Sequence, residues 1–223
     1  MNVQRIMVVV FLLIIISSIA AIFFLPESLA FKIIKERGPV ENAQVIFYVT
    51  GALVSWIYAR RRIWNGGYHG SLILLIFAMR ELDLQKQFTG ISITRTKYYF
   101  HSAAPLFFKL MCAFIVISIA VFLVAFIRKN YAVFLQNVKA HKNWSLSVIA
   151  GLLSMLFAIF VDSSTRVLAS LGIESIQYDR LLRIAIEELF ELAMPFFFLN
   201  ALLLYGNQST AITRGNRRGR PFT

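Results

Sequence analysis

The stretch IMVVVFLLIIISSIAAIFFL, residues 6–25, decides the fold class of this chain. Ser17 and Ser18 are its only polar members among twenty residues. A helix of that length covers about 30 Å, the thickness of the hydrocarbon core of a bilayer. The run also exceeds the roughly 7–15 apolar residues of a secretory signal peptide. We therefore expect an uncleaved first transmembrane helix that follows Arg5.

The composition extends this expectation to the whole chain. Of the 223 residues, 58% are hydrophobic and 15% are charged, whereas soluble domains are about half apolar. The charged residues cluster between the apolar runs and do not recur along helix faces. These features predict an all-α integral membrane protein with a single polytopic domain over residues 1–206. Residues 207–223 are polar, rich in Gly and Arg, and typical of a disordered basic cytoplasmic tail.

Further apolar stretches resemble the first in length and predict a bundle of about six transmembrane helices. The expected spans are residues 6–25, 43–59, 70–89, 104–127, 144–163 and 184–205. Between the first two, Pro26 to Gly38 alternates apolar and charged residues, as in a short helix that lies in the membrane interface. Gly38-Pro39 then breaks this helix, and Pro39 suits the first turn of the next span.

The loops between these spans orient the bundle. With both termini inside, the inner segments hold twelve Lys/Arg and the outer segments hold nine, which favours N-in/C-in topology by the positive-inside rule. All eleven acidic residues then fall in the outer half. They are Glu27, Glu36, Glu41, Glu81, Asp83, Asp162, Glu174, Asp179, Glu187, Glu188 and Glu191.

We therefore attribute the net charge of +12 to basic residues that orient the chain in the membrane. The expected partners are membrane lipids, and no nucleic acid is expected. Oligomeric state is left open by the sequence. A compact chain with a basic cytoplasmic face fits a multi-pass protein of the bacterial inner membrane, so the outer half faces the periplasm.

The third expected span has an unusual charged end, Arg80-Glu81-Leu82-Asp83-Leu84-Gln85-Lys86. If the helix continues to about Thr89, Arg80 lies near the bilayer centre and must line a polar cavity. Alternatively, the helix stops early and the segment re-enters from outside. In either case Asp83 can pair with Arg80 or with Lys86, each three residues away.

The sixth expected span begins with three acids, Glu187, Glu188 and Glu191, spaced to share one helix face. Pro195 follows four residues after Glu191 and cannot donate a hydrogen bond to its carbonyl oxygen, which is thereby freed. Together with Glu41, these oxygens are candidate ligands for a divalent metal. An all-oxygen set suits Mg, Ca or Mn better than Zn.

These observations give a candidate site in the outer half of the membrane. The expected catalytic residues are Glu81, Asp83, Glu188 and Arg80. The expected metal ligands are Glu187, Glu188, Glu191 and Glu41. The expected substrate-binding residues are Arg80, Lys86, Arg166 and His101, the last being the only histidine on the outer side.

Three functions fit this site. The first is a membrane-embedded enzyme, a hydrolase or transferase, that acts on a lipid or lipid-linked substrate; a carboxylate would serve as base or metal ligand, and Arg80 would meet a phosphate. The second is an ion- or proton-coupled transporter or channel. The third is a non-catalytic scaffold subunit whose charges fix partner helices. The chain lacks HExxH, GxSxG and Walker motifs, and resembles no family closely enough to choose among them.

Overall fold

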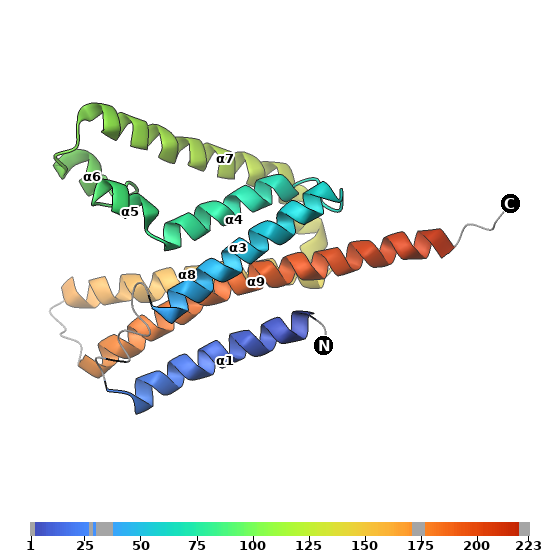
Figure 1. Ribbon diagram of the computed structural model, residues 1–223, viewed down its shortest axis with the longest axis horizontal. Coiled ribbons are helices and arrows are strands. Elements are labelled where there is room, and N and C mark those ends of the chain that lie inside the picture. Colours follow the sequence, from blue (N-terminus) through green and yellow to red (C-terminus); the bar gives the residue numbers. More distant parts are fainter. Residues whose placement is uncertain (1–2, 27–28, 30–37, 171–176, 219–223) are drawn as a thin grey trace.

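The computed structural model describes residues 3–26, 29, 38–170 and 177–218, and every regular element in these ranges is a helix (Figure 1). The expectation of an all-helical protein is therefore confirmed. The helices are α1 (Val3–Phe24), α3 (Pro39–Arg60), α4 (Gly67–Glu81), α5 (Leu84–Thr89), α6 (Thr96–His101), α7 (Leu106–Lys139), α8 (Asn143–Ser170) and α9 (Gln177–Arg218).

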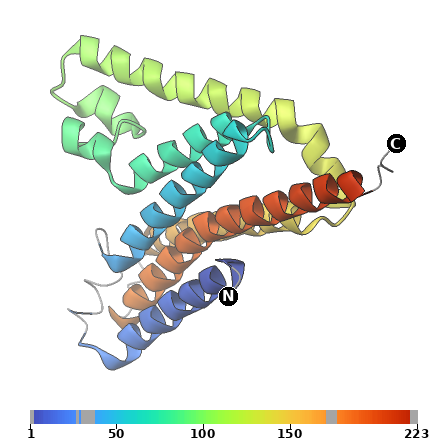
Figure 2. The same cartoon turned by 45° about the vertical axis from the view of Figure 1, so that its right-hand side comes forward.

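Helix α9 is the centre of the fold. It packs against α8, α3 and α1, and α4 packs on the far side of α3; Figures 1 and 2 show α9 between α1 and α3. A group of buried apolar side chains joins α1, α3 and α9. Its members are Phe11, Val40, Phe47, Leu192, Ala193, Phe196 and Leu199. Stacked Phe11 and Phe196, with ring centroids 3.9 Å apart, hold α1 to α9.

Helices α3 and α4 form a tight antiparallel hairpin. The hydroxyl of Ser55 donates a hydrogen bond to the carbonyl oxygen of Gly67 at 2.7 Å. A Cβ placed on Gly67 would lie 2.5 Å from the backbone oxygen of Ser55, so only glycine permits this approach. The sequence predicts a tight turn at residues 64–70; the structure has a tight turn that lies earlier, at residues 61–66, because α4 already begins at Gly67.

Three helices are long and apolar enough to cross a membrane: Leu106–Lys139, Asn143–Ser164 and Leu182–Ser209, within α7, α8 and α9. Six were expected, so this count is lower among the described residues. Helix α4 has 15 residues and measures about 22 Å, less than the hydrocarbon core.

Helix α3 has sufficient length to cross a membrane, but Glu41, Gln44 and Arg60 dilute its apolar character. Helix α1, with 22 residues from Val3 to Phe24, covers nearly all of the first expected span, and its fully described apolar stretch is Val8–Ala20.

Helix α7 is apolar on all sides from Leu110 to Ile127, and its first half stands apart from the other long helices (Figure 1). Farther along, Phe122 and Phe126 contact His69 of α4. Its 34 residues extend about 51 Å, more than the bilayer core. Most of its large apolar side chains, Phe107, Phe114 and Val121 among them, are exposed. A helix of this kind is stable where lipid covers it.

The third expected span breaks after Glu81. Leu82 ends α4, and Asp83 adopts the left-handed conformation with φ 49° before α5 begins at Leu84. Of the two alternatives open from the sequence, the structure has the one in which the helix stops early. Arg80 consequently lies in the last turn of α4, away from the middle of a span.

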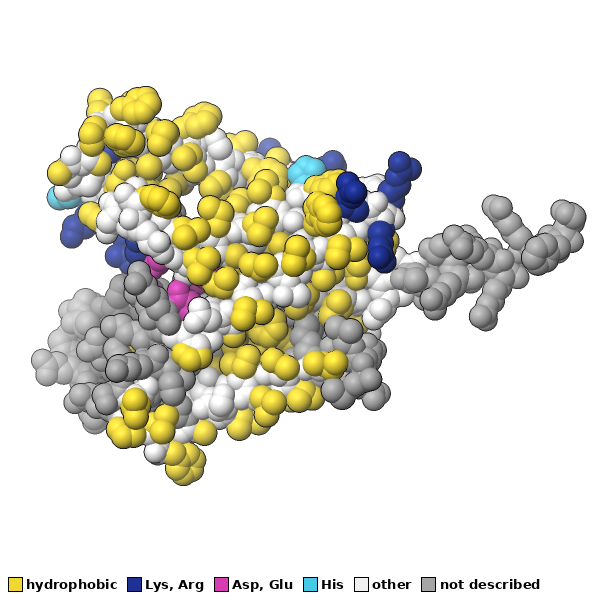
Figure 3. Space-filling model, viewed as in Figure 1, with side chains coloured by type: hydrophobic (Ala, Val, Ile, Leu, Met, Phe, Trp, Pro, Cys, Tyr) yellow, Lys and Arg dark blue, Asp and Glu magenta, His cyan; other side chains and the backbone are white. Residues whose placement is uncertain are grey.

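The described acidic side chains gather toward one end of the molecule. We call the end with Glu41, Glu81 and Glu191 the acidic end, and the end with the α3–α4 turn, which follows Arg60, the basic end. Figure 3 shows the acidic side chains toward one side, with basic ones beside them, and a second group of basic side chains over this turn.

Aromatic rings gather at the basic end. The ring of Tyr205 lies 6.2 Å from that of Trp64 and 5.5 Å from that of Trp144. Tyr and Trp are enriched where proteins meet the membrane interface.

Two expectations concern the flanking segments. Most of the interfacial helix expected at Pro26 to Gly38 lies outside the described residues. At the other terminus, α9 continues to Arg218, so part of the segment 207–223 that was expected to be disordered is helical.

Candidate functional site

Charged side chains from four helices converge at the acidic end. Helix α3 contributes Glu41 from its first turn, and α4 contributes Arg80 and Glu81 from its last turn. Helix α9 contributes Glu191, whose charge interacts with those of Arg80, Glu41 and Asp162 of α8. We call this set of side chains the acidic cluster. Two helix boundaries position this cluster: α3 begins at Pro39, and α4 is interrupted at Asp83.

Arg80 is the cation of the acidic cluster. Its charge acts favourably on both Glu81 and Glu191, at a longer range than a direct ion pair such as the one that Lys86 forms with Asp83. Tyr48 of α3 is 3% exposed and lies within electrostatic reach of Arg80, Glu81 and Glu191. A guanidinium, a phenol and carboxylates in one place can bind an anionic group and transfer a proton.

Glu188 is held from α3 by Gln44. The Gln44 Nε2 atom lies 3.4 Å from Glu188 Oε2 and 3.3 Å from the Glu188 carbonyl oxygen, and donates to both. The groups whose charges act most strongly on Glu188 are Glu191, Glu187, Glu41 and Glu81, all of them acidic. Glu188 thus lies on a side of the cluster where negative charge accumulates.

Gln44 and Tyr48 are site residues that the sequence analysis missed. They lie three and seven residues after Glu41, on the same face of α3. This spacing was the available signal, but it carries meaning only once Glu41 is known to face α4 and α9. Within the described part of the chain, Gln44 Oε1 is the one fully buried side-chain polar atom with no hydrogen-bond partner, a condition that costs about 1–3 kcal/mol.

The site is less enclosed than the sequence suggested. Arg80 is exposed, and Glu81, Glu188 and Glu191 are only partly buried within the protein. The expectation of a buried carboxylate–Arg site is therefore corrected to a partly open one. The reason is the break at Asp83, which puts Arg80 at a helix end.

The expected divalent-metal site is not formed. Among the described residues, no three His, Cys, Asp or Glu side chains are arranged so that they could hold a metal ion. Glu187, Glu188, Glu191 and Glu41 influence one another electrostatically, but they do not form a ligand shell. Carboxylates on separate helices repel one another, so their electrostatic free energy is lower when they are farther apart, unless a cation lies between them.

Other expected site residues lie elsewhere. Asp83 forms an ion pair with Lys86, one of the two pairings that the sequence left open, and its charge reaches Glu81. His101 is exposed in an open hollow beside Lys97 on α6, and both views place α6 away from α9 (Figures 1 and 2). His101 therefore does not join the acidic cluster. Arg166 belongs to α8, but its side chain lies outside the described residues.

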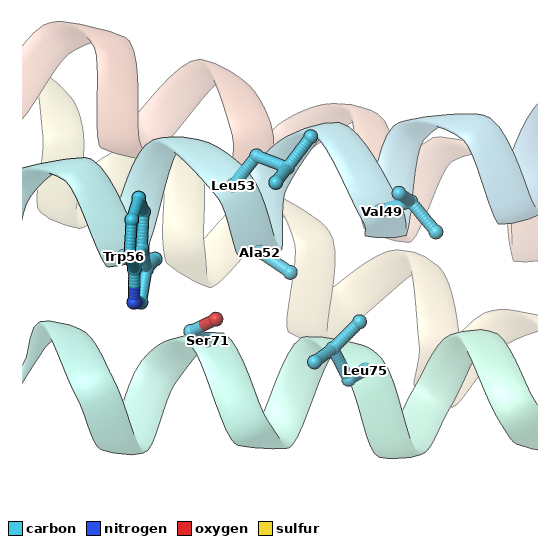
Figure 4. A pocket seen from close by; sticks show the side chains of 6 residues that line it. All are labelled: Val49, Ala52, Leu53, Trp56, Ser71 and Leu75. Atoms are coloured by element: carbon cyan, nitrogen blue, oxygen red, sulfur yellow. The ribbon is translucent and has the colours of Figure 1, made fainter.

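An apolar groove runs along the outside of α3 and α4, with a volume of about 320 Å³. Its lining residues are Val49, Ala52, Leu53, Trp56, Ser71 and Leu75 (Figure 4). Val49 follows Tyr48 directly, and Leu75 precedes Arg80 by five residues. The groove thus extends from the region of the basic end to within about two helical turns of the acidic cluster.

Comparison with known proteins assigns no function to this arrangement, because no protein-family model, curated protein or solved structure matches the chain.

Proposed function

We propose that the chain is a multi-spanning membrane enzyme, a hydrolase or transferase, that acts on a lipid or lipid-linked substrate at the acidic end. Both termini lie on the basic, cytoplasmic side, and in a bacterial inner membrane the site faces the periplasm. The observation that carries the proposal is the placement of an exposed Arg80 at the end of α4, within electrostatic reach of Glu81 on its own helix and Glu191 of α9.

The chemistry available at this place fits a phosphate-bearing headgroup. Arg80 presents a planar set of N–H donors that matches phosphate oxygens. The neighbouring carboxylates Glu81 and Glu191 supply a general base for an attacking water or hydroxyl group. The charge that develops on the phosphate is stabilised by Arg80.

The position of the cluster supports a lipid as substrate. The apolar groove between α3 and α4 ends near it and can take an acyl chain. The exposed apolar surface of α7 and the other candidate spans requires lipid around the molecule. A substrate that arrives through the bilayer would therefore present its chain to the groove and its headgroup to Arg80.

A transporter fits these observations less well, because a transport path needs polar groups in both halves of the molecule. Towards the basic end, Asn200 Nδ2 donates to Ser147 Oγ at 3.0 Å, and Ser147 Oγ donates to the Phe197 carbonyl oxygen at 2.9 Å. These contacts use both side chains to join α8 to α9.

Turnover of lipids by the purified full-length protein tests the proposal. The wild type is incubated in vesicles of mixed phospholipids, and products are followed by mass spectrometry. Arg80→Ala should reduce product formation by about a hundredfold or more, the usual cost of losing one donor to a transition-state anion. Arg95→Ala, which removes an exposed arginine between α5 and α6, should leave turnover unchanged.

Two results would contradict the enzyme. One is wild-type turnover by Arg80→Ala with an unchanged unfolding temperature. The other is no product from any phospholipid class, combined with proton or cation flux into the same vesicles, which would favour the transporter.

A further inference from the structure

Gln44 has an orientation that the structure fixes. Its side chain is 1% exposed, and its Nε2 atom contacts two oxygens of Glu188, one from the backbone and one from the carboxylate. A backbone carbonyl only accepts hydrogen bonds, so the amide nitrogen must face Glu188. Oε1, on the same planar amide, is buried next to this contact and has no partner.

Around Gln44 Oε1, the side chains that the structure describes offer this oxygen no hydrogen-bond donor. Gln44 Oε1 requires an N–H or O–H group. Glu188, its neighbour, experiences the charges of four other glutamates most strongly. Arg80, by contrast, acts on Glu81 and Glu191. A group that satisfies both Gln44 and Glu188 must be positively charged and must donate hydrogen bonds.

A primary ammonium group has both properties. It carries one positive charge and three N–H donors, enough for Gln44 Oε1, the Glu188 carboxylate and one further oxygen. A divalent metal fits poorly, because the described carboxylates do not form a ligand set. A quaternary ammonium group also fits poorly, because it has no N–H bond to give to Gln44 Oε1.

We propose that Gln44 and Glu188 form a subsite for a primary ammonium group carried by the headgroup of the lipid substrate. This inference rests on the proposed function and narrows it. With Arg80 at the phosphate and Glu188 at the ammonium, the acidic cluster recognises a zwitterionic aminophospholipid. The two subsites are linked through Glu191, which interacts with the charges of both Arg80 and Glu188.

Lipid retention tests the subsite without any variant. The full chain is purified into nanodiscs that contain phosphatidylglycerol with equal minor shares of phosphatidylethanolamine and phosphatidylcholine, and bound lipids are counted by native mass spectrometry. We expect phosphatidylethanolamine to be enriched about tenfold over phosphatidylcholine, as for one charged hydrogen bond. Equal retention of the two lipids would overturn the proposal.

Variants then locate the binding. Gln44→Met and Glu188→Gln should each remove most of the enrichment. Gln136→Met alters an exposed glutamine on α7 and should leave it unchanged. If Gln44→Met retains the preference for phosphatidylethanolamine, the ammonium binds elsewhere and the assignment is wrong.

A free amine separates the two sources of an ammonium group. In nanodiscs of phosphatidylglycerol alone, ethanolamine should raise the unfolding temperature of the wild type but not of Gln44→Met. Stabilisation by ethanolamine without enrichment of phosphatidylethanolamine would overturn the lipid source. Absence of both effects would overturn the subsite itself.

The proposed function fails separately. Enriched phosphatidylethanolamine without turnover of any lipid would refute the enzyme and leave the subsite standing. Turnover of another phospholipid without this enrichment would refute the ammonium subsite and leave the enzyme standing.

Discussion

Arg80 shows how one residue makes a charged cluster tolerable next to a membrane. An arginine at the centre of a span costs roughly 2.5–3.5 kcal/mol on insertion scales. In the structure Arg80 lies in the last turn of α4, where it is exposed and where the helix dipole favours a cation. Its charge also compensates Glu81 and Glu191. The same placement leaves the guanidinium accessible to a headgroup.

At this scale the sequence identified charges more readily than uncharged partners. Arg80, Glu188 and Glu191 stand out because an ionised group is rare within an apolar run. Gln44 and Tyr48 do not, since a single amide or phenol in a span is common and inexpensive. Their importance depends on which residues of α4 and α9 face them, and that information is tertiary.

Gly67 is the residue on which the α3–α4 hairpin depends. A Cβ there would lie 2.5 Å from the Ser55 oxygen and 2.9 Å from the Ala59 nitrogen, both backbone atoms. Gly67→Ala should therefore destabilise the protein by about 1–3 kcal/mol, despite the better helix propensity of alanine. Thermal unfolding in detergent measures this as a lower midpoint.

Gly51→Ala is the matched control for this prediction. Its Cβ would meet only Leu74 Cδ1 at 3.2 Å and Leu202 Cδ1 at 3.8 Å, which are ends of flexible side chains. Its unfolding midpoint should stay close to that of the wild type. Equal midpoints for the two alanine variants would show that α3 and α4 are not packed this closely.

At the level of elements, the sequence predicted helix starts better than helix ends. Pro39 and Glu41 begin α3 as expected, because a proline and an acid in the first turn are local signals. The end of α4 was left open, because Leu82 and Asp83 are compatible with a continuing helix. The left-handed backbone conformation at Asp83 ends α4, and the third expected span is shorter as a result.

Asp83 is consequently predicted to act through its backbone. Asn also tolerates the left-handed region, so Asp83→Asn should lose only the partly exposed ion pair with Lys86, worth up to about 1 kcal/mol. Asp83→Val should cost about 1–3 kcal/mol, because a β-branched residue is strained at positive φ. Unfolding midpoints and lipid turnover of both variants distinguish this role from the catalytic one that the sequence suggested. Loss of turnover in a stable Asp83→Asn protein would restore the catalytic assignment.

For the whole molecule, polarity along the bundle axis is the main organising feature. Parts of α3, α4 and α9 bring acids together at one end, while the basic α3–α4 turn and the Trp64–Tyr205 rings lie at the other. The sequence already predicted where the acids gather, because every acid fell in an outer loop or in the outer half of an expected span. The sequence did not show that the first half of α7 stands apart or that α9 forms the centre, since every apolar span looks alike before packing is known.

This polarity predicts the orientation of the protein in a cell membrane. In a Cys112→Ser background, which removes the single cysteine, Thr94→Cys and Asn143→Cys place exposed thiols near the acidic and the basic end, respectively. Neither substitution changes a charge, so the positive-inside signal is preserved. A membrane-impermeant maleimide should label Thr94→Cys in intact bacterial cells and Asn143→Cys only after the membrane is permeabilised. The reverse pattern would place the acidic cluster in the cytoplasm, so a substrate would have to reach Arg80 from the inner leaflet.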